Sequence, residues 1–393
     1  MSATLIGALG DLMRLQRWNA MPRVEVWSEA ENIAYTTHIT YAIGKLDGMS
    51  NEMLLHGMLR ALLKSLNKHL VSDILVGTRD VIRSVNPEAW KKLIDEAAKE
   101  TAKLFPRQIY KSVHKYMTHD GNYSIPDDDG SNKNKIENLI KYTQFKVAMS
   151  ECVTNMKVYE KSYETVKHAL GEKLDSLEGS DRFEEYYAKL EDFPQRIENL
   201  KNLRRWNRVN RSVETTVLGH TFIVTLLALV VSLICRDDSR VAEKNPKPPE
   251  FVYKAILRAL FHDVPETFTG DIISPVKEII NKTTPGLLSE VEKEMMKDFK
   301  EAMPESIHKD IDQYRLLEEL DDSVPYSIPS LVKACDSLAI VLECLFEKET
   351  GRVGGEMTSA YISYISRLQN SEWEPIRYLS TQVLLEHPKA SWK

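Results

Sequence analysis

Two adjacent side chains that can bind a metal, His262 and Asp263, directly follow an apolar run at residues 255–261. This run has the composition of a buried helix, so the imidazole and the carboxylate are expected in the protein interior. Burying both groups costs several kcal/mol unless they are paired or bound to a metal. The doublet therefore predicts a metal site whose other ligands come from elsewhere in the chain.

Two further residues are candidates for the missing ligands. His220 stands at the start of an apolar run, and Asp336 lies inside another apolar segment. A lone histidine at the edge of a buried helix is usually a core residue, and a buried aspartate can also be a cap or an ion-pair partner. Because the doublet already needs partners, we expect one divalent ion on His220, His262, Asp263 and Asp336. Mixed histidine and aspartate ligation favours Co, Mn, Zn or Fe over Ca, and Mg is also considered.

The elements that must position these ligands are predicted to be helices. Helical periodicity dominates the chain, and the alternation typical of strands is scarce. The segments 136–159, 183–199 and 288–302 have the length and composition of helices, whereas turn residues at 120–132 and prolines at 246–249 predict loops. We therefore expect an all-α protein. A second doublet, His119-Asp120, follows no apolar run and is expected on a surface loop.

The two halves of the chain match each other in three segments that keep the same order. Residues 15–19 (LQRWN) match 203–207 (LRRWN), 59–62 match 257–260 (both LRAL), and positions within 136–152 match positions within 328–344. Ordered self-similarity of this kind is typical of a tandem repeat. We expect two helical bundles, with a first domain at 1–170, a linker helix region at 171–200 and a second domain at 201–393.

The first half lacks the metal ligands. Where the second half has Glu266, the first has Lys68, and a charged lysine repels a metal ion. The first half is therefore expected to be a degenerate copy that serves as a structural partner, with a regulatory nucleotide site as the alternative. The residues that align with His220, His262, Asp263 and Asp336 are Asn32, Lys64, Ser65 and Gln144.

Length and composition are those of a soluble globular protein with two or three domains, at 393 residues with 42% hydrophobic and 28% charged residues. The net charge of −6 argues against nucleic-acid binding, but it leaves small phosphorylated substrates open because a local site can still be basic.

Cysteine usage and the apolar runs bear on location. The four cysteines form no C-x-x-C pair and the N-terminus has no secretory pattern, so we expect free thiols in the cytoplasm. The apolar run 222–235 has 14 residues, which is short of the ~20 that span a bilayer. We expect a buried core helix there and no membrane association.

The pattern His…His-Asp…Asp resembles that of the HD-domain superfamily of metal-dependent phosphohydrolases. Over about residues 200–350 the chain is similar in more detail to the bacterial 5′-deoxynucleotidase (YfbR-like) branch. The motifs that carry this similarity are the Arg-Trp pair ending 14 residues before His220, Glu266 and Asp271 at four and nine residues after His262, the Pro-Val-Lys ending at Lys277, and the Lys-Ala-Cys-Asp ending at Asp336.

The resemblance implies an enzyme that removes phosphate from deoxyribonucleoside 5′-monophosphates. The ion would polarise the phosphoryl oxygen and lower the pKa of bound water. Glu266 is expected to be the general acid or base, with Asp263 as the catalytic ligand beside it. Pro265 indicates that the helix ends near Glu266, so a surface charge at a helix end is the alternative for this glutamate.

The same resemblance implies a set of substrate-binding residues. Arg205 would bind the phosphate through its planar guanidinium, and Trp206 would pack on the sugar and leave no room for a 2′-hydroxyl. Asp271 would accept a hydrogen bond from the 3′-hydroxyl, next to a glycine that permits close approach of the backbone. Lys277 would be a second phosphate contact. An exposed arginine beside a core tryptophan, and a solvated lysine, are the alternatives.

The chain departs from the family in two respects. Members are single-domain homodimers, so we expect the first half to replace one subunit as an internal pseudo-dimer, with further homo-oligomerisation left open. An insertion around 281–326 lengthens the spacing before Asp336 and could add a wall for a triphosphate. Two alternatives therefore accompany the monophosphate reaction, namely a dNTP triphosphohydrolase that releases tripolyphosphate and a nucleotide-binding regulator without turnover.

Overall fold

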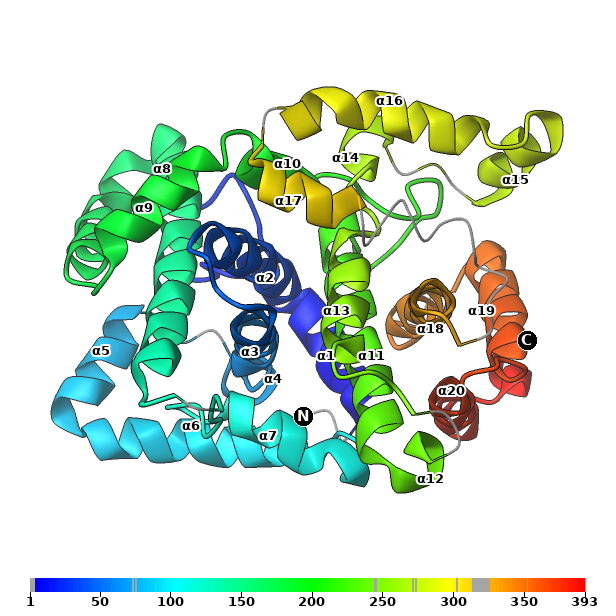
Figure 1. Ribbon diagram of the computed structural model, residues 1–393, viewed down its shortest axis with the longest axis horizontal. Helices are drawn as coiled ribbons and strands as arrows, with labels where there is room; N and C mark the ends of the chain where they lie inside the picture. The colour runs from blue at the N-terminus through cyan, green and yellow to red at the C-terminus, as the bar shows by residue number, and fades with distance from the viewer. Residues whose placement is uncertain are drawn as a thin grey trace. The chain divides into compact units, whose positions relative to one another are not determined.

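The described residues of the computed structural model are 4–72, 74, 76–126, 128–243, 246–270, 272, 274–301, 303–312, 326–351 and 353–392. They fold into helices and contain no strand, apart from two isolated β-bridges, so the all-α prediction is confirmed (Figure 1). The chain divides into two compact units, Met1–Pro194 (unit 1) and Gln195–Lys393 (unit 2). This division falls inside the predicted linker region 171–200.

Unit 1 is built around α2, α3 and α8, which pack against one another. The segment 136–159 lies within α8, which bends at Tyr159, where the backbone leaves helical geometry. The helices of this unit are α1 (Leu5–Arg14), α2 (Glu29–Leu46), α3 (Asn51–Lys64), α4 (Lys68–Val71), α5 (Val76–Val85), α6 (Pro87–Ala102), η1 (Arg107–Ile109), α7 (Tyr110–Met117), α8 (Ser131–Asp175) and α9 (Ser180–Lys189).

The predicted helical segment 183–199 is divided in the structure. It spans the end of α9 and α10 (Phe193–Asn199), and the three residues between them are not helical. Glu191 adopts a φ of 48° there, a left-handed conformation that a right-handed helix cannot contain. Both parts of the segment were therefore correctly predicted to be helical, but the turn that separates the two helices was not predicted.

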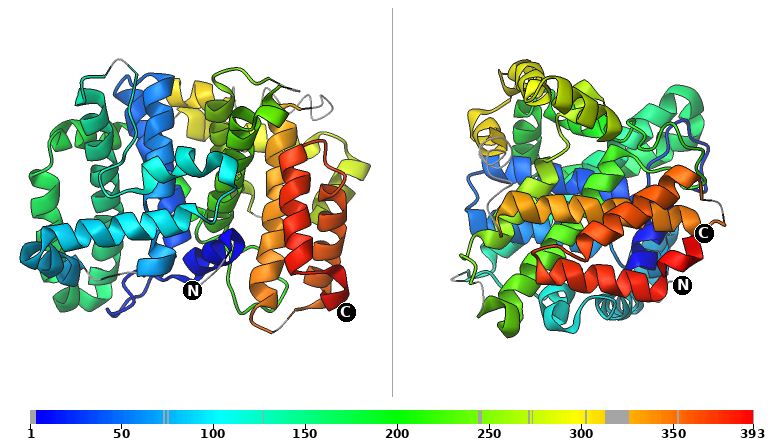
Figure 2. Two further views of the ribbon diagram at one scale, coloured as in Figure 1. Left: turned by 90° about the horizontal axis from the view of Figure 1, so that it is seen from below. Right: turned by 90° about the vertical axis from the view of Figure 1, so that its right-hand side faces the viewer.

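Unit 2 is built around α11, which packs against α13 and α18. The helices α18, α19 and α20 lie alongside one another (Figure 2). The helices of this unit are α11 (Val217–Asp237), α12 (Ser239–Ala242), α13 (Phe251–Phe261), α14 (Glu266–Thr269), α15 (Ser274–Thr283), α16 (Leu287–Glu301), α17 (Glu305–Ile311), α18 (Ile328–Lys348), α19 (Gly355–Leu368), α20 (Glu374–Glu386) and η4 (Lys389–Trp392).

The central helix α11 is the apolar run identified in the sequence. By length and composition it could cross a membrane, with a mean hydropathy of 2.4 over 18 residues, but that whole window is buried inside the protein. Every residue from Val217 to Cys235 is buried. A helix that is apolar on all sides and covered on all sides is the core of its unit.

The two units contain short elements of matching length. The four-residue α4 follows α3 as the four-residue α14 follows α13, and each is followed by a ten-residue helix, α5 or α15. The residue that ends α4, Ser72, has a φ of 61°, and the residue that ends α14, Gly270, has a φ of 70°. The Arg-Trp segments also match, because Trp18 and Trp206 have positive φ values of 55° and 58°.

Candidate active site

His220 lies in the first turn of α11. This helix begins after Thr216, whose hydroxyl caps it by accepting a hydrogen bond from the backbone N–H of Gly219. The imidazole is fully buried, and both ring nitrogens face carboxylates. Nε2 lies 2.9 Å from Oδ1 of Asp336, and Nδ1 lies 2.8 Å from Oε1 of Glu343.

His262 and Asp263 lie directly after the last residue of α13, at the point where the chain leaves the core. His262 caps the helix, and its Nδ1 donates to the carbonyl oxygen of Ala259 at 2.6 Å. This bond leaves Nε2 as the nitrogen that can ligate a metal. Nε2 of His262 lies 3.1 Å from Oδ2 of Asp263, and that oxygen lies 3.9 Å from Nε2 of His220.

Asp336 reaches the same place from α18. The packing of α11 against both α13 and α18 brings together ligands from three helices that are distant in sequence. One ligand atom each from His220, His262 and Asp336 lie within 4.8 Å of one another. Asp263 completes this group through its short distances to the two imidazoles.

The unsatisfied atoms of this cluster fit a divalent cation. Nε2 of His262 and Oδ2 of Asp263 are buried and lie 3.1 Å from each other, but neither makes a hydrogen bond of acceptable geometry. Buried polar atoms of this kind are costly unless something else binds them. Two imidazole nitrogens and two carboxylates are a donor set that suits a first-row metal ion.

Electrostatics keep the carboxylates of the cluster ionised. Burial raises the pKa of Asp263, but the neighbouring imidazoles of His262 and His220 outweigh it and hold that pKa well below its usual range. Burial lowers the pKa of His220, but the carboxylates of Glu343 and Asp336 have the larger effect and raise it to about 9. The carboxylates of Asp263 and Asp336 therefore stay ionised and can bind a cation.

Arg205 and Trp206 converge on the carboxylate of Glu343. The Nε of Arg205 donates to Oε1 at 3.1 Å, and the Nε1 of Trp206 donates to Oε2 at 2.6 Å. Oε1 also faces His220, as described above. Glu343 is fully buried on α18, and burial raises its pKa, but Arg205 and His220 lower it well below the usual range.

Glu343 was not selected from the sequence as a site residue, although two signals pointed to it. A glutamate among the apolar residues of 338–346 is expensive unless it is paired. It also aligns with Glu151 in the repeat. Its contacts are with residues more than a hundred positions earlier in the chain, which spacing within one helix does not reveal.

Glu266 begins the separate short helix α14 instead of continuing α13. It is buried, and its Oε1 lies 3.3 Å from Nζ of Lys277 on α15. The predicted acid or base and the predicted second phosphate contact are therefore paired with each other. The glycine before Asp271, Gly270, has a φ of 70° that favours glycine. Asp271 itself lies outside the described residues.

Unit 1 contains the same arrangement of an arginine and a tryptophan on one buried glutamate, which we call the Arg-Trp-Glu hub. Nε of Arg17 lies 2.8 Å from Oε1 of Glu151, and the Nε1 of Trp18 donates to Oε2 at 2.6 Å. In both units the arginine and tryptophan sit beside an isolated β-bridge, Gln16 to Ser28 in unit 1 and Arg204 to Thr216 in unit 2. The histidine position is occupied by Asn32, whose Nδ2 donates to Glu29 at 3.0 Å.

The second doublet behaves as a surface pair. Nδ1 of His119 lies 2.7 Å from Oδ1 of Asp120, and the other oxygen of Asp120 pairs with Lys91 at 2.6 Å. The side chain of Asp120 is 55% exposed, so this doublet lacks the burial that makes His262-Asp263 a metal candidate.

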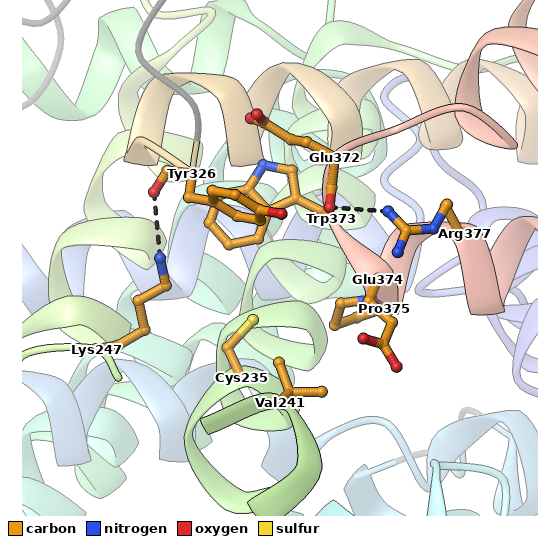
Figure 3. A pocket seen from close by; sticks show the side chains of 9 residues that line it. All are labelled: Cys235, Val241, Lys247, Tyr326, Glu372, Trp373, Glu374, Pro375 and Arg377. Atoms are coloured by element: carbon orange, nitrogen blue, oxygen red, sulfur yellow. Dashed lines mark hydrogen bonds between the residues drawn. The ribbon is translucent and has the colours of Figure 1, made fainter. Parts of the chain in front are cut away.

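A cavity of about 330 Å³ lies elsewhere in unit 2 and contains none of the cluster residues (Figure 3). It is lined by Cys235 from the far end of α11, about 22 Å along the helix from His220. The ammonium of Lys247 lies over the rings of Phe251, Tyr326 and Trp373, at 5.0, 5.5 and 4.8 Å from their centroids. Lys247 therefore already makes the cation–π contacts that these rings offer. The cavity is not part of the candidate site, because no residue of the metal-ligand cluster lines it.

The second half of the chain matches a known family. The family model described as "5'-deoxynucleotidase YfbR-like" matches residues 192–386. This range contains all four cluster residues, the Arg-Trp pair and Glu343.

Curated proteins also match part of the chain. A 5′-deoxynucleotidase of Pectobacterium atrosepticum is 27% identical over 176 residues, which cover 44% of this chain and 82% of that protein. A 5′-deoxynucleotidase of Pasteurella multocida is 22% identical over 186 residues, covering 47% of this chain and 88% of that protein. A dATP triphosphohydrolase of Salmonella phage PMBT28 is 32% identical over 88 residues, covering 22% of this chain and 44% of that protein.

Proposed function

Because residues 192–386 are a domain of the 5′-deoxynucleotidase YfbR-like family, we propose that the protein is a metal-dependent phosphohydrolase. Its substrates would be deoxyribonucleoside 5′-monophosphates, and its products a deoxynucleoside and phosphate. The observation that carries this proposal is the cluster in which ligand atoms of His220, His262 and Asp336 lie within 4.8 Å of one another, with Asp263 beside them.

The metal ligands in this proposal are His220, His262, Asp263 and Asp336. When bound there, a divalent ion such as Co, Mn, Zn, Fe or Mg would supply Lewis-acid polarisation of the phosphate and make a water molecule more acidic. The buried Nε2 of His262 and Oδ2 of Asp263, which make no hydrogen bond of acceptable geometry, support this assignment.

The remaining residues in this proposal bind and protonate the substrate. Arg205 would orient the phosphate, and Lys277 would add a second positive charge beside it. Glu266 would transfer a proton to the departing 5′-oxygen or from the attacking water, and its burial beside Lys277 supports a role inside the site. Trp206 would pack on the deoxyribose, and Asp271 would accept a hydrogen bond from the 3′-hydroxyl.

A second candidate reaction is dNTP triphosphohydrolysis with release of tripolyphosphate. Two phage proteins named dATP triphosphohydrolase support it, because they are 32% and 37% identical to this chain over 88 and 82 residues. Those matches cover 44% and 39% of the phage proteins, whereas the deoxynucleotidases are covered over 82% and 88% of their length. The monophosphate reaction is therefore the first choice.

A product analysis distinguishes these functions. Protein loaded with Co, Mn or Mg should release phosphate from one or more deoxyribonucleoside monophosphates, with Asp336→Asn as the inactive control. Chromatography after incubation with dATP or dGTP should show tripolyphosphate if the second reaction operates. Binding of a nucleotide without any hydrolysis would instead identify a regulator, and release of neither product would reject both reactions.

Unit 1 in this proposal is a degenerate copy of unit 2 that replaces the second subunit of a homodimer. The matching order of short helices and the two Arg-Trp-Glu hubs support a duplication. A monomer by light scattering would support a pseudo-dimer within one chain, and further homo-oligomerisation stays open in this proposal. A cytoplasmic location is a separate part of the proposal. A nucleotide that changes turnover without being hydrolysed would instead assign unit 1 a regulatory site.

A further inference from the structure

Three hydrogen-bond donors share the carboxylate of Glu343. They belong to one proposed metal ligand, His220, and to the two proposed substrate-binding residues, Arg205 and Trp206. The distances are 2.8 Å from His220 Nδ1, 3.1 Å from Arg205 Nε and 2.6 Å from Trp206 Nε1. Glu343 is fully buried, so water does not compete for these contacts.

Both ring nitrogens of His220 face carboxylates, but only Nε2 faces the proposed metal ligands Asp336 and Asp263, whereas Nδ1 faces Glu343. A carboxylate accepts hydrogen bonds and does not donate them, so the nitrogen that faces Glu343 must be the N–H donor. With an ion bound to Asp336 and Asp263, Nε2 would give its lone pair to that ion, while Nδ1 keeps the proton that it donates to Glu343. A carboxylate behind a ligating histidine also makes the imidazole a stronger ligand.

We propose that Glu343 is a positioning residue. It would set the tautomer of His220 for metal binding and fix the positions of Arg205 and Trp206 relative to the ion. This inference rests on the proposed metal centre and adds a residue that links the ion to the substrate-binding pair. In this proposal Glu343 acts through these three donors, because both of its oxygens face them.

Unit 1 provides an internal comparison. Glu151 receives the same arginine and tryptophan donors, Arg17 at 2.8 Å and Trp18 at 2.6 Å, but the position that aligns with His220 is Asn32. The contacts of the glutamate with the arginine and the tryptophan therefore form in unit 1 without a histidine at that position. Unit 2 has in addition the hydrogen bond that Nδ1 of His220 donates to Glu343.

The decisive variant is Glu343→Gln, with Glu151→Gln as the matched control. A glutamine side chain has one acceptor oxygen for three donors, and its amide N–H groups would face other N–H groups. We expect Glu343→Gln to weaken metal binding by about 10- to 100-fold, the usual effect of removing such a partner. Isothermal titration of metal-free protein with Co²⁺ or Mn²⁺ measures this affinity without reference to any substrate. Glu151→Gln should leave it unchanged.

A second measurement keeps the inference testable if Glu343→Gln fails to fold. In the Zn²⁺-loaded natural protein, nitrogen NMR of the histidines should show that the proton of His220 is on Nδ1 and that Nε2 binds the ion. A proton on Nε2, or a folded Glu343→Gln protein with unchanged metal affinity, would overturn the proposal. Equal loss of affinity in Glu343→Gln and Glu151→Gln would also overturn it, because the effect would then be structural.

The test of Glu343 does not depend on whether the protein catalyses the proposed reaction. Metal affinity and the tautomer of His220 are measured in the absence of nucleotide. A protein that binds the ion through the expected tautomer but hydrolyses no deoxynucleotide would retain the role of Glu343 and reject the reaction.

Discussion

The ammonium nitrogen of Lys68 lies 2.8 Å from Oε2 of Glu29, a carboxylate that is fully buried in unit 1. Arg17 lies 3.4 Å from the same oxygen. Burial raises the pKa of Glu29, but the charges of Lys68 and Arg17 outweigh it, so the pKa is lowered. Lys68 aligns with the acidic Glu266 of unit 2, so unit 1 has a lysine paired with a buried carboxylate where unit 2 has a proposed catalytic acid or base.

Replacing this lysine should destabilise unit 1. Lys68→Met leaves Glu29 buried with a weaker set of partners, and we expect a loss of about 1–3 kcal/mol. The control is Lys99→Met, because Lys99 pairs with Glu96 on an exposed helix surface and such pairs contribute little. Thermal unfolding measures both. Adding Glu29→Gln to Lys68→Met should recover part of the loss, and no recovery would show that the ion pair is not the cause.

Removing a proposed ligand should remove the ion without unfolding the protein. Asp336→Asn keeps the shape of the side chain but lacks the charge, so we expect metal affinity to fall by more than about 100-fold, beyond the effect of a supporting residue. Elemental analysis of the purified variant and its circular dichroism spectrum measure the two properties. A full complement of metal in Asp336→Asn would exclude Asp336 from the ligand set.

Glu266→Gln should separate chemistry from metal binding. If Glu266 transfers a proton in the reaction, kcat should fall by about 10²- to 10⁴-fold while the metal content stays at that of the natural protein. Glu278→Gln, an exposed glutamate on the same helix as Lys277, is the control and should keep full activity. Unchanged kcat in Glu266→Gln would assign the glutamate a structural role as the ion-pair partner of Lys277.

The sequence predicted best what depends on residue type and periodicity. The helical fold followed from apolar spacing, and His262 and Asp263 were identified because both are costly to bury at the end of an apolar helix. The contacts that depend on long-range packing were not predictable. Glu343 gains its partners only when α18 packs on α11, and Glu266 begins a new helix because the chain turns after His262.

The hub glutamate of unit 1 should give the protein a pH-dependent stability. Burial raises the pKa of Glu151 to about 7 from an ordinary value of 4.5, although Arg17 lowers it. A carboxyl whose pKa is raised by folding holds its proton more firmly in the folded state. Its favourable contribution is therefore complete below pH 4.5 and is lost as the pH rises through 7.

Glu151→Gln tests this dependence because glutamine does not titrate. We expect the melting temperature of the natural protein to fall relative to that of Glu151→Gln as the pH rises from 4.5 to 7. A series of thermal melts in that range measures the difference between the two proteins. A constant difference would show that Glu151 has the same charge in the folded and unfolded states.

Trp206 should control discrimination between deoxyribose and ribose. Its backbone has a φ of 58°, and its Nε1 is held by Glu343 at 2.6 Å, so the indole ring is fixed before substrate binds. A fixed ring can exclude a 2′-hydroxyl, and removing part of it should make room for one. We expect Trp206→Phe to raise kcat/KM for AMP relative to dAMP by about 10-fold, the scale of a change in pocket size.

The matched control for this prediction is Trp18→Phe in unit 1. Trp18 has a φ of 55° and the same 2.6 Å bond to a buried glutamate, but no metal ligand stands beside that glutamate. The substitution should therefore perturb the local packing to a similar degree and leave the AMP to dAMP ratio unchanged. A shift of the ratio in Trp18→Phe would place nucleotide contacts in unit 1, and an unchanged ratio in Trp206→Phe would assign sugar selection to other residues.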